Sequence, residues 1–168
     1  LGVLSYMFKW FFLIIIYQPL FAFSNELDSY DFMNGSWRCV ATGELTEDLI
    51  YKYENTSKTS VKNLSSKSIS TFTTYNRNNR SLSSVLYIES TERMTFDGNV
   101  MSSFGVKIQK TEIIEDDLSF LTPEFIEAIK SSTEEISKSK INKIDNDHHT
   151  LTDIEDGDIM SCSRLKNT

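Results

Sequence analysis

Apolar and polar residues alternate along much of this chain, a pattern typical of β-strands that bury one face. In residues 36–41 the alternation places Trp37, Cys39 and Ala41 on one face of a strand. Residues 158–164 repeat the pattern near the other end of the chain. Further strands are expected, from alternation and from Tyr, Phe, Ile and Thr content, over 49–53, 67–75, 85–96, 135–144 and 150–154.

A hairpin is expected at Asp97-Gly98, because Asp-Gly suits the tight turns that join antiparallel strands. The strand after this turn has its own alternation, which predicts its two faces. The inward set is Phe104, Val106 and Ile108, and the outward set is Lys107, Gln109 and Thr111.

Residues 122–131 interrupt the strand pattern with the features of a short amphipathic helix. Thr122 stands in a capping position, Pro123 suits the first helical position, and an acidic residue follows. Phe125, Ile126 and Ile129 share one face of the helix. The chain is therefore predicted to be mainly β, with one helix near 123–131, as an antiparallel up-and-down barrel or a strongly curled sheet.

The first 24 residues have the layout of a secretory signal peptide, with Lys9, a short apolar run and the small-x-small ending Ala22-Phe23-Ser24. We expect cleavage between Ser24 and Asn25, and an exported protein that is periplasmic or secreted. The alternative is a leader kept as a membrane anchor, but its apolar run is short for a spanning helix. Residues 25–168 then form one domain, without a stable membrane span.

The chain carries a net charge of −7, and loss of the leader with Lys9 makes it −8. This balance disfavours a nucleic-acid partner, which needs a basic surface, and docking on anionic lipid. The simplest consequence of the net negative charge is that the protein stays in solution.

Cys39 and Cys162 are the two cysteines of the chain, and an even pair in an exported protein predicts a disulfide. Two free buried thiols are the alternative. A disulfide requires the first and last strands to be neighbours. Cys162 shares a predicted strand face with Met160 and the stem of Arg164, and we expect Trp37 and Arg164 to be core residues near the bond.

The segments 34–39 and 159–164 together resemble the two ends of lipocalin-like, calycin-type barrels of small exported bacterial proteins. In that family a Gly-x-Trp strand opens the barrel, and the last strand often ends in a basic residue near the Trp. The resemblance implies a non-enzymatic protein that binds a small apolar ligand or lipid. The alternative is a structural or interaction protein of the cell envelope, with an envelope protein as partner and a barrel filled by its own side chains.

Catalytic motifs are absent from the sequence, which has neither a glycine-rich phosphate loop nor a Gly-x-Ser-x-Gly elbow. We expect no enzyme activity, no catalytic residues and no cofactor. His148 and His149, with Asp145 or Asp147, are the best metal candidates, but their spacing matches no recognised site, so a polar surface turn is favoured and no metal is expected. The acidic run 153–158 lacks the order of a calcium loop and is expected to be a solvated hairpin.

Overall fold

The structure, a computed structural model, describes residues 27–79, 82–132 and 134–166. The predicted signal peptide and its cleavage site lie outside the described residues. By their internal contacts the residues divide into two units, 1–32 and 33–168. A short 3-10 helix, η1, covers Asp31–Met33. Among the described residues, no helix has the length and apolar character that a membrane span requires.

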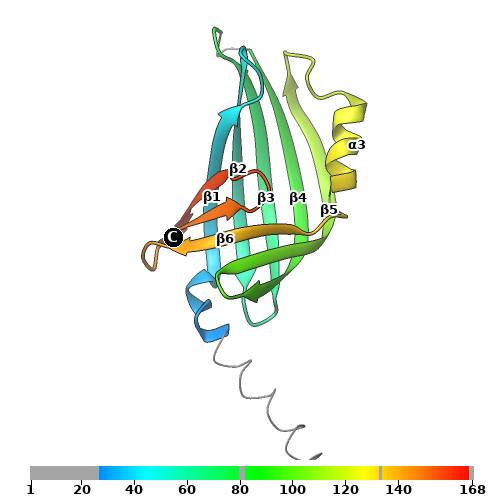
Figure 1. Cartoon of the computed structure of the whole chain (residues 1–168). Coiled ribbons are helices and arrows are strands. Elements are labelled where there is room, and N and C mark those ends of the chain that lie inside the picture. Colours follow the sequence, from blue (N-terminus) through cyan, green and yellow to red (C-terminus); the bar gives the residue numbers. More distant parts are fainter. Residues whose placement is uncertain (1–26, 80–81, 133, 167–168) are drawn as a thin grey trace, which may run out of the picture. The chain divides into compact units, whose positions relative to one another are not determined.

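Within the described residues, the second unit forms a closed antiparallel barrel whose eight strands follow one another in chain order (Figure 1). This up-and-down topology confirms the predicted fold class and is compatible with a lipocalin-like architecture. The strands are β1 (Gly35–Glu44), β2 (Leu49–Ser60), β3 (Ser65–Asn76), β4 (Ser83–Asp97), β5 (Val100–Asp116), β6 (Ser137–Lys143), β7 (His148–Asp153) and β8 (Ile159–Arg164).

The barrel is closed along only part of its length, because its last three strands are short. β8 pairs with β1 over Trp37–Val40, and β6 pairs with β5 over Val100–Ser103. β1 to β5 continue beyond these pairings, and Figure 1 shows helix α3 (Pro123–Ser132) at that end.

Helix α3 forms as the sequence predicts. The Thr122 hydroxyl accepts a hydrogen bond from the Phe125 amide at 3.3 Å, as an N-terminal cap does. The ring of Phe125 lies 5.9 Å from that of Phe72 on β3 and 4.8 Å from that of Phe120. The helix is therefore held by aromatic packing on the extended end of the sheet.

The prediction for the two faces of β5 is wrong at two positions, because bulges change the register. Gly105 adopts φ +59°, and the pairing with β4 slips by one residue there. Phe104 consequently lies beneath the guanidinium of exposed Arg93, at 5.0 Å, and its neighbour Ser103 is buried. A further slip turns Thr111 toward the inner face, where it pairs with Ile88.

Candidate functional site

A cavity of about 250 Å³ lies inside the closed part of the barrel. We call it the serine cavity, because hydroxyls from four strands line it. The polar lining includes Asn55, Ser57, Ser66, Ser103, Ser137 and Ser139. Methionines and Trp37 contribute an apolar part of the wall, so the interior offers both hydrogen-bonding and apolar surface.

A second cavity, of about 330 Å³, adjoins the first. The two share Tyr53, Ser137, Ser139, Leu151 and Met160 as lining residues. We call it the aspartate cavity, because three carboxylates line it beyond the shared wall. The first cavity alone is below the roughly 300 Å³ at which ligand pockets usually begin, whereas the adjoining space exceeds it.

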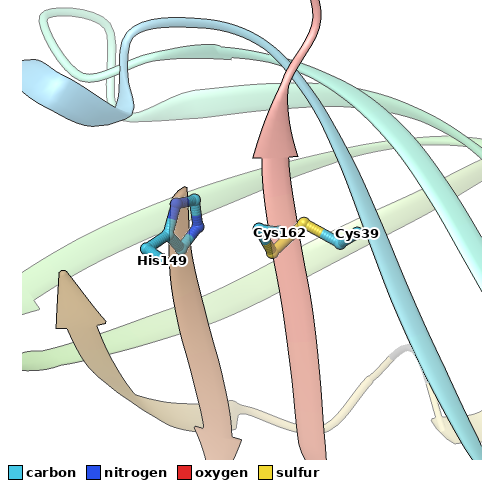
Figure 2. A group of neighbouring side chains, drawn as sticks. All are labelled: Cys39, His149 and Cys162. Carbon is cyan, nitrogen blue, oxygen red and sulfur yellow. A yellow bond between two sulfur atoms is a disulfide. The ribbon is translucent and has the colours of Figure 1, made fainter. Parts of the chain in front are cut away.

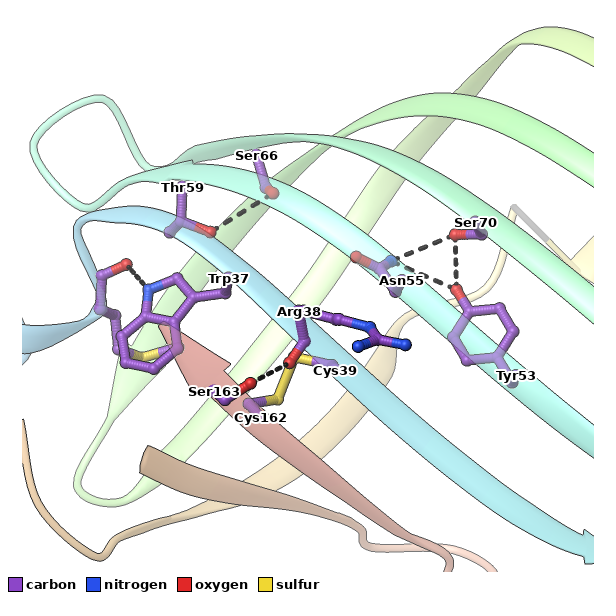
Figure 3. The surroundings of a disulfide bond; sticks show 11 residues. Trp37, Arg38, Cys39, Tyr53, Asn55, Thr59, Ser66, Ser70, Cys162 and Ser163 are labelled. Carbon is purple, nitrogen blue, oxygen red and sulfur yellow. Dashed lines mark hydrogen bonds between the residues drawn. A yellow bond between two sulfur atoms is a disulfide. The ribbon is translucent and has the colours of Figure 1, made fainter. Parts of the chain in front are cut away.

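Alternation along β3 brings Ser66 into this lining and continues a row of internal serines beyond it. Ser66, Ser68 and Ser70 occupy successive inward positions, and all three are buried. Their hydroxyls pair across strands: Ser68 with Ser90 at 2.9 Å, and Ser70 with Tyr53 at 2.8 Å. Figure 3 shows the Ser70 contact and the nearby amide of Asn55, which donates to the same hydroxyl at 3.2 Å. These pairings compensate for burying polar groups inside the barrel.

Glu92 places a carboxylate in this lining. It alternates on β4 between two inward residues, Ser90 and buried Met94, and its backbone pairs with Ser66. Burial raises the pKa of the Glu92 carboxyl, and a hydrogen bond from the Ser103 hydroxyl lowers it by less. Neither cavity has a Lys or Arg among its described lining residues.

Carboxylates also line the aspartate cavity, where Asp153, Asp156 and Asp158 come from the β7–β8 hairpin. Asp156 and Asp158 are exposed, so this cavity reaches solvent. Tyr51 donates a hydrogen bond from its hydroxyl to Asp158 at 2.9 Å. The predicted solvated acidic hairpin thus also forms part of a cavity wall.

The disulfide predicted between Cys39 and Cys162 is present, and the two residues face each other in the β1–β8 register. Trp37, only 2% exposed, packs in the same core cluster. Its Nε1 donates to the Met33 carbonyl at 2.8 Å, a bond visible in Figure 3. The Arg164 guanidinium lies 4.4 Å from the Trp37 ring and is only half-buried. Trp37 is therefore a core residue, whereas Arg164 packs on it from the partly exposed side.

The prediction that both histidines lie in a surface turn is wrong for His149. β7 begins at His148, and its alternation turns the two side chains to opposite faces. His148 is exposed and its Nδ1 lies 2.9 Å from Asp145. His149 is 2% exposed, and burial, with a smaller effect of Arg164, lowers its pKa to about 4.

The structure therefore brings His148 to Asp145 but turns His149 to the other face, so the two histidines proposed as metal candidates do not converge. His149 instead lies beside the disulfide, as Figure 2 shows, with donor atoms of His149, Cys39 and Cys162 within 4.8 Å of one another. Metal ligation by cysteine needs thiolates, and both sulfur atoms are bonded to each other here. The oxidised protein consequently offers one imidazole at this position.

Sequence reasoning missed Glu92 and the serine lining. The available signal was polar residues at every second position of two neighbouring strands, Ser66 to Ser70 and Ser90 to Glu92. Such a stripe is also what a solvent-facing strand shows, so only the barrel register identifies it as internal.

No protein-family model matches the chain, and no curated protein is significantly similar to it.

Proposed function

We propose that this chain is an exported, non-enzymatic barrel protein that binds a small molecule in the adjoining serine and aspartate cavities. The observation that carries the proposal is the polar lining of an internal space in a small barrel. A barrel filled for stability alone buries apolar side chains there, because unfilled polar surface costs free energy. A concave site with apolar walls and a few convergent polar groups is typical of small-molecule binding.

The ligand proposed here is amphipathic, in place of the purely apolar ligand or lipid that the lipocalin-like resemblance implies. Trp37, Met94 and Met160 provide apolar wall, whereas the serine hydroxyls and Asn55 provide hydrogen-bonding groups. A hydroxyl can donate one hydrogen bond and accept two, so the serines that line the cavities keep capacity for a ligand. An alkyl chain alone would leave that capacity unused.

Export is part of the proposal and rests on the leader and the disulfide. Structural disulfides persist in oxidising compartments, which agrees with the exported location expected from residues 1–24. The alternative remains a structural or interaction protein of the envelope. Its surface would carry the function, and the cavities would then have no ligand.

Native mass spectrometry and thermal shift with a small-molecule library test the proposal. Ser139→Phe places a ring in the wall that the two cavities share, whereas Ser161→Phe places one at an exposed position on β8. We expect wild type and Ser161→Phe to bind the same compounds and Ser139→Phe to lose them. Identical ligand profiles for all three proteins, or no ligand for any, would contradict binding in the cavities.

A further inference from the structure

We propose that the ligand is a small organic amine, whose ammonium group pairs with Glu92 while its apolar body lies along the aromatic and methionine wall. The inference rests on the proposed function and specifies the class of ligand. It starts from an asymmetry of charge: the described lining of the two cavities contains five carboxylates, Glu92, Glu135, Asp153, Asp156 and Asp158, and no Lys or Arg. The imidazole in that lining, His149, is uncharged at neutral pH because burial lowers its pKa to about 4.

Glu92 is the decisive group because it lies in the cavity away from the exposed hairpin. An ionised carboxylate in such a place loses much of its hydration, and a single hydroxyl from Ser103 compensates for only part of that loss. Natural proteins usually pair such a charge with Arg or Lys, and the cavity lining supplies neither. A cation from the ligand completes the pair.

The aspartates of the β7–β8 hairpin favour the same ligand charge. Asp156 and Asp158 are exposed at the solvent side of the aspartate cavity, and Asp153 lines it further in. A concave entrance lined by one sign of charge raises the local concentration of the opposite ion and the rate of its binding. Carboxylates at the entrance and at Glu92 therefore both select against anions.

The remaining wall indicates the body of the ligand. Tyr51, Tyr53 and Phe72 line the aspartate cavity, and the rings of Tyr51 and Phe72 lie 5.9 Å apart and nearly parallel. Aromatic faces accommodate apolar groups and also attract organic cations. An amine with an aromatic or alkyl body matches this combination better than a multiply charged polyamine does.

Calorimetric titration with three probes of one shape tests the inference: 4-phenylbutylamine, 4-phenylbutanol and 4-phenylbutanoate, at neutral pH and physiological salt. We expect the amine to bind about tenfold more tightly than the alcohol, and the carboxylate more weakly than both. Glu92→Gln should abolish the preference for the amine and leave alcohol binding nearly unchanged.

Glu89→Gln is the matched control. Glu89 lies on the same strand, accepts a hydrogen bond from the Tyr87 hydroxyl at 2.8 Å, and pairs in register with Lys110. The variant removes the same charge outside the cavities, so the preference for the amine should persist. Equal melting temperatures for Glu92→Gln and wild type, or a higher one for the variant, show that the variant is folded.

The outcomes separate the two proposals. Equal binding of amine and alcohol to wild type, or an amine preference that survives Glu92→Gln, overturns the amine inference and leaves cavity binding intact. Tightest binding of the carboxylate also overturns it, because Glu92 would then be a neutral donor. Failure of every probe, together with a wild type and Ser139→Phe that are equally ligand-free, overturns both.

Discussion

The rings of His149 and Trp37 meet edge to face, with centroids 4.4 Å apart and an interplanar angle of 74°. This contact links β7 to β1 across β8, which carries Cys162 and pairs with both strands. Trp37 also packs in one core cluster with the disulfide. A covalent bond therefore joins β1 to the last strand, β8, and an aromatic pair joins β1 to β7.

Replacement of Trp37 by Ala should lower the free energy of unfolding by about 3–5 kcal/mol. The ring is almost fully buried, and the variant also loses the hydrogen bond to the Met33 carbonyl and the contact with Arg164. Urea denaturation followed by circular dichroism measures the change. Trp37→Phe keeps most of the apolar volume and should cost less; an unchanged midpoint for Trp37→Ala would contradict a core role.

Removal of the disulfide should destabilise the protein by about 2–5 kcal/mol, since the bond links residues 123 positions apart and restricts the unfolded chain. The double variant Cys39→Ala/Cys162→Ala tests this by denaturation with and without reductant. Reductant should lower the stability of wild type and leave the double variant unaffected. An equal response of both proteins would show that the bond does not contribute.

Stability should depend on pH through His149. Its pKa is lowered from 6.5 to about 4 in the folded protein, so between these values the unfolded chain binds more protons than the folded one. Stability is therefore complete above about pH 6.5 and falls as the pH is lowered toward 4, by at most about 3 kcal/mol. The pKa of Glu92 is instead raised from 4.5 by folding, so its contribution to stability has the opposite sign and decreases as the pH rises above that value.

The variant His149→Phe isolates this effect, because it keeps an aromatic ring against Trp37 and cannot titrate. The difference in unfolding free energy between wild type and His149→Phe should change across pH 4 to 6.5. His148→Gln is the control, because it changes an exposed side chain on the opposite face of β7 and leaves the contact of His149 with Trp37 in place. Parallel curves for wild type and His149→Phe would mean that the pKa of His149 is not lowered by folding.

The exported protein should begin at Asn25, because the Ala22-Phe23-Ser24 ending fits signal-peptide cleavage. Expression of the chain in a secreting bacterial host, followed by N-terminal sequencing of the exported fraction, measures this. A product that retains residues 10–17 in the membrane fraction would instead support an uncleaved anchor.

The sequence by itself determined the elements whose signals are local. Alternation of polar and apolar residues predicted the strands, because successive side chains point to opposite faces. Thr122 and Pro123 predicted the start of α3, because the cap and the proline act within one helical turn. The pairing of Cys39 with Cys162 followed from their number and the expected compartment, and it required the two ends of the barrel to meet.

Only the tertiary structure decided which face of each strand is internal and what the interior contains. Alternation defines two faces, and pairing with neighbouring strands selects between them. The bulge at Gly105 turned Phe104 outward and Ser103 inward. The same long-range pairing buried His149 opposite Cys162 and placed Glu92 among serines, although both residues belong to locally polar segments. Their surroundings come from strands far apart in the chain, so no local pattern encodes them.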